Sequence, residues 1–334
     1  MPTEDPAGEI DVLLVVPPES LLLDVAGPAE ALRLANARLV VDGRPRRFRL
    51  RFVGPAAQAS TSVGLTVSGL EALPGELVRP TWLVLVGQPG LALRTPGAGT
   101  DDTVDWLRDV GGPALEASPA SRLVTVCAGT LLAARAGLIG ARRCTTHHEH
   151  LATLRELAPQ AHVVDNRVFV IDGSLASSAG ITAGIDLTLH LVAQTCGEDV
   201  AAAVAQAMVV YLRRTQADPE LSPLLAHRHH LHAALHRVQD AVCARPEATW
   251  TLDSLAAAGH VTGRHLLRLF ALHAEVSPTT YVETIRLERA RQALVHGATV
   301  SRAAEQGGFS SDLQLRRAWS RHLPGTPRVA RRPV

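Results

Sequence analysis

Residues 252–270 and 300–319 of this 334-residue chain share one local pattern, which restricts the C-terminal part to short, closely packed helices. Each copy has an Ala-rich segment, a glycine that allows a tight turn, and a Thr or Ser that can cap the following helix. In that following segment a Leu and an aromatic residue lie four positions apart, so both face one side of a helix. These pairs are Leu266 with Phe270 and Leu315 with Trp319. The pattern predicts two helix-turn-helix units in tandem.

A single long helix is predicted between the two units. Ser277 can cap it, Pro278 suits its first position and Gly297 can end it, so we expect a helix over 279–296. Its apolar residues should pack on both units; they are Tyr281, Ile285, Leu287, Ala290 and Leu294. A further helix, 231–244, is expected to open this domain.

This stretch resembles an AraC-type DNA-binding domain. The resemblance rests on Leu255-Ala256, Thr262 to Leu266, Arg268 to Phe270, Val276 to Pro278, Tyr281, Arg286-Leu287, Ala290 and Gly308-Phe309. It implies that a rigid linking helix holds two recognition helices about one DNA turn, roughly 34 Å, apart. The departures from the family pattern include Ala303, Gly307 and Glu275, the last at a turn position that is usually Gly. We therefore expect a looser second unit that contributes less sequence readout.

The faces of the recognition helices opposite the buried Leu and aromatic residues are expected to meet DNA. The predicted contact residues are Thr262, Gly263, Arg264, Leu267 and Arg268 in the first unit, and Ser311, Asp312, Leu313, Gln314, Arg316 and Arg317 in the second. Arg can form two hydrogen bonds with guanine, Gln can do so with adenine, and an exposed Leu suits a thymine methyl group. The alternative is a generic helical domain with a solvated arginine face.

The N-terminal part alternates short apolar runs with helical stretches. The runs expected to be buried strands are 12–16, 48–53, 82–86 and 123–126, with a hairpin over 168–177. Strands separated by helices predict an α/β fold with a doubly wound, mostly parallel sheet flanked by helices, followed by the all-α C-terminal domain. Further helices are expected from Gly27 to Ala37, from Ile181 to Thr195 with a stop at Gly197, and from Val200 to Arg214.

Three segments of this part resemble the ThiJ/PfpI-type, glutamine-amidotransferase-like domains. They are Leu23 to Leu32, Val126 to Leu138 with Thr145 to His147, and Ser177 to Asp186. Cys127 falls where a strand turns sharply into a helix, and a helix N-terminus favours a thiolate and offers amides to an anion. The resemblance implies a pairing of Cys127 with Asp24, as in isonitrile hydratases. The predicted ligand pocket comprises Asp24, Gly87, Gln88, Cys127, Ala128, Gly129 and His147.

The roles of these residues remain open from the sequence. Ala128 stands where the enzymes have Thr or His, so a usual side-chain partner of the cysteine is missing. Cys127 could therefore be a pocket nucleophile or only a small residue in a crowded turn. Asp24 could equally cap the helix near Gly27, and His147 could be a capping residue.

Charge divides the chain in the same place as the patterns do. Residues 218–334 contain 15 Arg and 10 acidic residues, a net of +5, whereas 1–217 contain 18 Arg and 22 acidic residues, a net of −4. A basic C-terminal module suits a polyanion such as DNA. We expect a sensor domain over 10–212, a linker over 213–227 and a DNA-binding domain over 228–334.

Scattered cysteines and the lack of an apolar run long enough for a bilayer predict a cytoplasmic protein without membrane association. No cofactor or metal is expected: the histidine-rich segments 147–150 and 227–236 are interpreted as solvated runs, although His232 and His236 have a spacing that can chelate zinc. The chain is predicted to be a sequence-specific transcriptional regulator of double-stranded DNA, sensing a small metabolite and, by resemblance, dimerising through its N-terminal domain. The alternative is a cysteine-dependent hydratase or hydrolase with an attached DNA-binding module.

Overall fold

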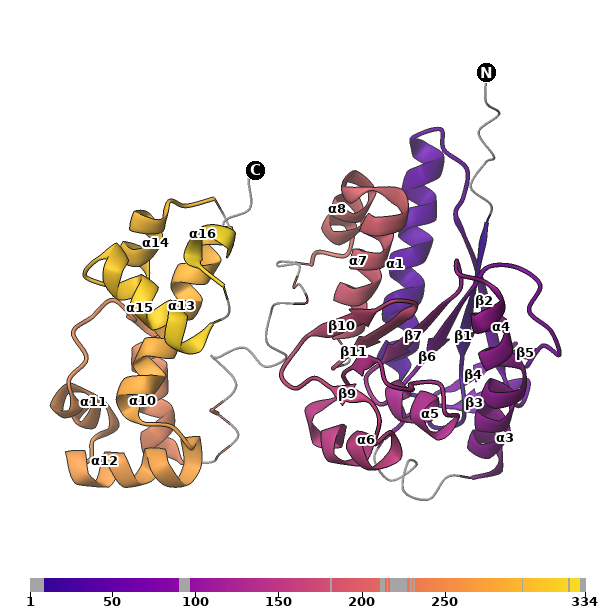
Figure 1. The fold of residues 1–334 in the computed structure, drawn as a ribbon. Coiled ribbons are helices and arrows are strands. Elements are labelled where there is room, and N and C mark those ends of the chain that lie inside the picture. Colours follow the sequence, from indigo (N-terminus) through magenta and orange to yellow (C-terminus); the bar gives the residue numbers. More distant parts are fainter. Residues whose placement is uncertain are drawn as a thin grey trace. The chain divides into compact units, whose positions relative to one another are not determined.

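The computed structural model describes residues 9–89, 97–180, 182–210, 214, 216, 227–228, 230, 232–295, 297–323 and 325–330. The chain divides into two compact units, Met1–Glu220 and Leu221–Val334, each of which is described by itself (Figure 1). The predicted linker, 213–227, lies mostly outside the described residues, so its limits stay a prediction.

A seven-stranded sheet forms the centre of the first unit. Its order is β10-β11-β7-β6-β1-β2-β5, and each neighbouring pair is parallel except β10 with β11. The strands are β1 (Ile10–Val15), β2 (Phe48–Gly54), β5 (Glu71–Ala72), β6 (Thr81–Leu85), β7 (Arg122–Val126), β10 (Phe169–Asp172) and β11 (Leu175–Ser178). Two short pairs lie outside it: β3 (Gln58–Ser60) with β4 (Thr66–Ser68), and β8 (Arg143–Cys144) with β9 (His162–Val163).

Helices cover both faces of this sheet because its central strands are apolar on both sides. In β1, Val12 and Leu14 belong to one hydrophobic core, whereas Leu13 and Val15 belong to the other. The first core includes α1 (Leu22–Val41), α7 (Ala183–Cys196) and α8 (Glu198–Ala207), which lie together in Figure 1. The second includes α3 (Ala98–Trp106), η1 (Leu107–Gly111), α4 (Gly112–Ala117), α5 (Gly129–Arg135) and α6 (Leu151–Leu157). The predicted doubly wound fold is confirmed.

Two helices differ from their predicted limits. The helix expected from Gly27 begins at Leu22, so Asp24 lies inside its first turn and does not take the capping position that was the alternative for it. The helix expected over 200–214 ends at Ala207, because Val209 leaves the helical conformation with a φ of 54°. Gly197 ends α7 as predicted, with a φ of 106°.

The second unit is entirely helical in its described part. It comprises α10 (Ala233–Ala244), α11 (Leu252–Gly259), α12 (Gly263–Leu269), η3 (Phe270–Ala274), α13 (Pro278–Val295), α14 (Val300–Gln306), α15 (Asp312–His322) and α16 (Pro327–Ala330). Both predicted helix-turn-helix units are present, as α11–α12 and α14–α15. Glu275 follows η3 with a φ of 58°, the left-handed conformation that explains why glycine suits this position.

Helix α13 joins the two helix-turn-helix units by contributing to both of their cores. Its first half provides Tyr281 and Ile285 to a core shared with α10, α11 and α12. Its second half provides Leu287, Ala290 and Leu294 to a core shared with α14 and α15. The prediction that one helix packs on both helix-turn-helix units is confirmed. Through α13 the two units form one continuous structure.

Candidate functional site

The first candidate recognition helix, α12, is capped and packed as its sequence requires. The Thr262 hydroxyl accepts a hydrogen bond from the backbone N–H of His265 at 3.3 Å. Leu266 and Phe270 are fully buried. The opposite face exposes side chains to solvent; these are Arg264, Leu267 and Arg268. Gly263 lies against Leu252 of α11, 3.3 Å from where a Cβ would stand, so it offers backbone rather than a side chain.

The second candidate recognition helix, α15, repeats this arrangement. The Ser311 hydroxyl accepts a hydrogen bond from the backbone N–H of Gln314 at 3.2 Å, and Leu315 and Trp319 are buried. The exposed residues include Leu313, Gln314, Arg316 and Arg317. Two of the predicted contact residues also bond within the protein.

Asp312 and Gln314 are those two residues. The Asp312 carboxylate accepts a hydrogen bond from the Ser301 hydroxyl at 3.0 Å, and Asp312 is only half-exposed. The Gln314 Oε1 atom accepts hydrogen bonds from both the backbone N–H and the hydroxyl of Ser310, at 2.7 and 3.0 Å. This leaves the Gln314 amide nitrogen as the group that can face a base.

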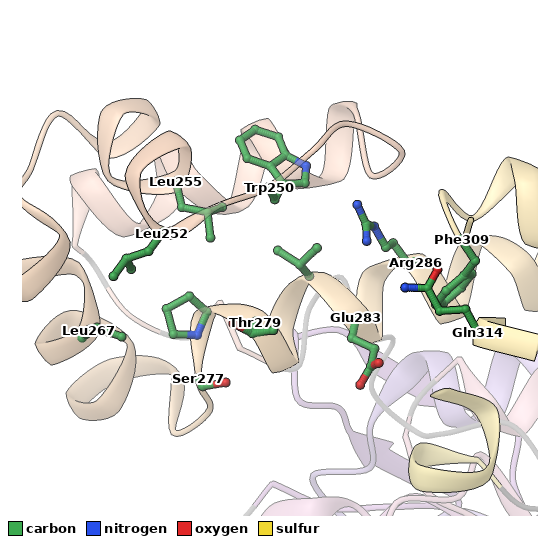
Figure 2. Close-up of a pocket in the computed structure, with 12 residues that line it drawn as sticks. Trp250, Leu252, Leu255, Leu267, Ser277, Thr279, Glu283, Arg286, Phe309 and Gln314 are labelled. Atoms are coloured by element: carbon green, nitrogen blue, oxygen red, sulfur yellow. The ribbon is translucent and has the colours of Figure 1, made fainter. Parts of the chain in front are cut away.

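Within the C-terminal domain, a groove of about 290 Å³ lies between the two helix-turn-helix units along α13 (Figure 2). Its floor includes Val282 and Glu283 of α13, and its walls include Leu267 of α12 and Gln314 of α15. Since Leu267 and Gln314 belong to the exposed faces of the recognition helices, the groove opens onto the surface predicted to meet DNA.

In the first unit, Cys127 occupies the sharp turn between β7 and α5. Its φ is 54°, a left-handed conformation that is strained for a residue with a Cβ. The thiol-bearing residue is buried, with 4% of its surface exposed. Gly129, at the start of α5, makes the turn possible, because a Cβ there would stand 2.2 Å from the Leu85 carbonyl oxygen. This is the strand-to-helix elbow that the sequence indicates.

Asp24 lies beside this elbow. Its Oδ2 atom accepts a hydrogen bond from the backbone N–H of Gly87 at 2.9 Å, whereas its buried Oδ1 atom has no hydrogen-bond partner among the described residues. Burial raises the pKa of the Asp24 carboxyl group to about 7, and the Gly87 hydrogen bond acts in the opposite direction. A Cβ on Gly87 would stand 2.7 Å from Asp24 Oδ2 and 3.0 Å from the Ala128 nitrogen, so these three segments meet.

Gln88 and His147 have structural contacts of their own. The Gln88 amide nitrogen donates to the Pro18 carbonyl oxygen at 2.6 Å and to the Thr100 hydroxyl at 3.1 Å. His147 accepts, through Nδ1, a hydrogen bond from the Glu149 N–H at 3.4 Å and so caps η2 (His148–His150). The capping alternative for His147 therefore has direct geometric support.

Buried hydroxyl residues outside the predicted pocket brace the elbow. The Thr146 hydroxyl donates to the Cys127 carbonyl oxygen at 2.9 Å, and the Cys127 N–H donates to the Ser178 carbonyl oxygen at 3.1 Å. The Thr130 hydroxyl donates to the Thr145 carbonyl oxygen at 2.9 Å. Thr130, Thr145, Thr146 and Ser178 are fully buried. Adjacent hydroxyl residues within otherwise apolar segments are the sequence signal that could have identified these contacts, because a buried hydroxyl requires a partner.

The second histidine segment differs from the solvated run that was expected. His230 is buried, and its ring centroid lies 4.4 Å from that of His236 and 6.0 Å from that of His273. The described residues contain no group of three or more His, Cys, Asp or Glu side chains placed to hold a metal ion. Nor does any helix among them have the length and apolar character needed to cross a membrane.

Two family models match this chain. The model described as Helix-turn-helix domain matches residues 255–333, and that of the DJ-1/PfpI family matches residues 116–194. The HTH-type transcriptional regulator GbdR of Pseudomonas aeruginosa is 31% identical over 257 residues, which cover 71% of this chain and 69% of GbdR. This chain belongs to the AraC-type transcriptional regulators with an N-terminal DJ-1/PfpI domain.

Other relatives bear on the enzymatic alternative. The HTH-type transcriptional regulator GlxA of Rhizobium meliloti is 27% identical over 314 residues, which cover 93% of this chain and 92% of GlxA. An isonitrile hydratase of Pseudomonas putida is 35% identical, but over only 34% of this chain and 46% of its own length. Because the relatives that match most of the chain are regulators, the hydratase alternative is not favoured.

Proposed function

We propose that this regulator reads its operator through the exposed faces of α12 and α15, and that a small metabolite bound beside Asp24 and Cys127 controls that reading. The observation that carries the first part is the pair of capped helices, each buried through a Leu and an aromatic residue and each exposing arginine. Exposed Arg264 and Arg268 suit guanine or phosphate, and Leu267 suits a thymine methyl group. The first helix-turn-helix unit, through α12, is expected to provide most of the sequence readout.

Binding of a labelled promoter fragment by full-length protein tests this part, with fluorescence anisotropy as the readout. Arg264→Ala is expected to weaken specific binding by about 1–3 kcal/mol, roughly 5- to 150-fold, if Arg264 contacts a base. The matched control is Arg155→Ala, which removes an exposed arginine of the first unit. Equal losses in the two variants, or no loss in either, would remove Arg264 from the interface.

Salt dependence separates the two kinds of arginine contact. Each phosphate contact that is lost lowers the slope of log affinity against log salt by about 1. Arg264→Ala should weaken binding to the operator more than to unrelated DNA if it reads a base, and equally if it contacts phosphate. The measurement is a salt titration on both duplexes.

The sensing part rests on the elbow and on the unpaired Asp24 oxygen. A buried acceptor without a partner is costly, and a ligand with a hydrogen-bond donor can satisfy it. Calorimetric titration of amine, amide and nitrile metabolites, repeated on Asp24→Asn and Cys127→Ala, tests this assignment. Unchanged affinity in both variants would place the ligand elsewhere.

We also propose a cytoplasmic homodimer that associates through its sensor domain, with the boundaries 10–212, 213–227 and 228–334. The four cysteines, all of them among the described residues, form no disulfide bond, which fits a reducing compartment. The dimer rests on family resemblance, and sedimentation equilibrium of the full chain tests it.

A further inference from the structure

The loop between α10 and α11 is held by a side chain from α13. The Arg286 guanidinium donates from Nε to the Pro246 carbonyl oxygen at 2.7 Å and from Nη2 to the Ala248 carbonyl oxygen at 2.8 Å. The indole N–H of Trp250 donates to the Arg245 carbonyl oxygen at 2.9 Å, so the loop is also braced from its far end. Arg286 and Trp250 face the groove between the two helix-turn-helix units (Figure 2).

The turn of the second helix-turn-helix unit, at Gly307 and Gly308, lies directly on this loop and on α13. A Cβ on Gly308, whose φ is 74°, would stand 2.4 Å from the Glu247 Cα. A Cβ on Gly307 would stand 2.7 Å from the Arg286 carbonyl oxygen. These contacts are between backbones, so they cannot be relieved by rotating a side chain. The missing side chains at this turn therefore allow the second helix-turn-helix unit to approach the first helix-turn-helix unit closely.

The hydrophobic core of the second helix-turn-helix unit is poorly suited to fixing, by itself, the position of that unit against the first helix-turn-helix unit. Five of its ten buried members are alanines, against two of eleven in the core of the first helix-turn-helix unit. Small side chains bury less area and interlock less. A polar clamp also ties α15 to α13, since Glu283 accepts hydrogen bonds from Arg321 and, at 2.8 Å, from His322. The placement of α15 thus depends on backbone contacts and charged groups as well as on its hydrophobic core.

We propose that Arg286, the 245–248 loop and the Gly307–Gly308 turn form a spacer that sets the distance between α12 and α15, and thereby the separation of DNA half-sites that the regulator accepts. This inference rests on the proposed function in that both helices must read DNA. One base pair of extra separation moves a half-site by about 3.4 Å along the duplex and turns it about the axis. A rigid spacer therefore rejects operators that differ by one base pair, whereas a loosened spacer tolerates them. Arg286 is a positioning residue in this scheme and does not contact DNA itself.

Selection of bound duplexes from a random DNA pool tests the spacer, using full-length wild type, Arg286→Met and Arg289→Met. Met keeps the apolar stem of Arg286 but removes both hydrogen bonds to the loop. Arg289 lies on the same helix and is exposed, so its variant controls for loss of an α13 arginine. Wild type and Arg289→Met are expected to recover two half-sites at one separation. Arg286→Met is expected to recover the same half-sites over separations that span at least three base pairs.

A direct affinity measurement accompanies the selection. Inserting one base pair between the half-sites is expected to cost wild type at least tenfold in affinity, and Arg286→Met less than threefold. If Arg286→Met does not fold, as judged by circular dichroism, Gly308→Ala takes its place and is expected to shift or broaden the preferred separation. A folded variant that keeps the wild-type separation and its sharpness overturns the spacer.

The wild type alone distinguishes the failure of the spacer from the failure of the proposed function. If it enriches no sequence, the proposed operator reading fails. If it enriches a single half-site with no partner at fixed separation, specific reading stands and the spacer is overturned.

Discussion

Replacing Asp24 by Asn tests the electrostatic description of the sensor-domain elbow. Burial raises the pKa of this carboxyl group from 3.8 to about 7. The folded protein therefore holds the Asp24 proton more tightly than the unfolded chain does between these pH values. Stability contributed by this group is present at low pH and is lost as the pH rises from about 4 to above 7. A rise of about 3 in the pKa of this group corresponds to about 4 kcal/mol in the free energy of unfolding.

Asn keeps the shape of the side chain and cannot ionise. The free energy of unfolding of Asp24→Asn, minus that of the wild type, should therefore increase by up to about 4 kcal/mol between pH 4 and pH 8. Urea titrations of the full chain at several pH values measure this difference. Tryptophan fluorescence reports on the first unit through the buried Trp82 and Trp106, and on the second unit through Trp250 and Trp319.

The comparison needs a control for removing an acidic group. Asp102 is exposed on α3 and lies outside the elbow, so Asp102→Asn serves as the control for removing a carboxyl group from the first unit. Because the chain has two units, the transition of the first unit is analysed separately. A constant difference between Asp24→Asn and wild type from pH 4 to pH 8 would refute the reasoning.

Three further substitutions test the packing of both units. Thr262→Ala removes the cap of α12 and should lower the stability of the second unit by about 1 kcal/mol in urea unfolding, whereas the exposed change Arg268→Ala should have little effect. Trp319→Ala empties a buried site and should lower the free energy of unfolding of the second unit by about 3–5 kcal/mol. In urea unfolding, the transition of the second unit should then be absent at the urea concentrations where it occurs in the wild type. Gly129→Ala places a Cβ 2.2 Å from a carbonyl oxygen and should lower the melting temperature of the first unit, whereas an unchanged melting temperature would contradict the tight elbow.

Local patterns in the sequence were sufficient for much of the second unit. The caps at Thr262 and Ser311 and the buried pair Leu266 and Phe270 were predicted because each depends on residues three or four positions apart. The strand-to-helix turn at Cys127 was predicted for the same reason, since an apolar run followed by Gly129 indicates it locally. Helix ends were less accurate, as at α1, whose first residue is Leu22 rather than Gly27.

Contacts between distant segments could not be obtained in this way. Asp24 was singled out from the sequence, but its partner is the amide of Gly87, 63 positions away, and that pairing depends on the order of strands in the sheet. Gln88 was predicted in the same pocket because it follows the buried strand 82–86, yet its amide nitrogen bonds to Pro18 and Thr100.

The sequence by itself determined that this chain has an α/β domain with a cysteine elbow and two tandem helix-turn-helix units. It did so because helical and strand periodicity, caps and turns are properties of neighbouring residues. The tertiary structure decided which buried polar groups meet and how closely the two helix-turn-helix units approach each other. Arg286 reaches a loop about 40 positions earlier in the chain, and Gly308 packs on that same loop. Such distances are set by the packing of whole helices, which no local pattern specifies.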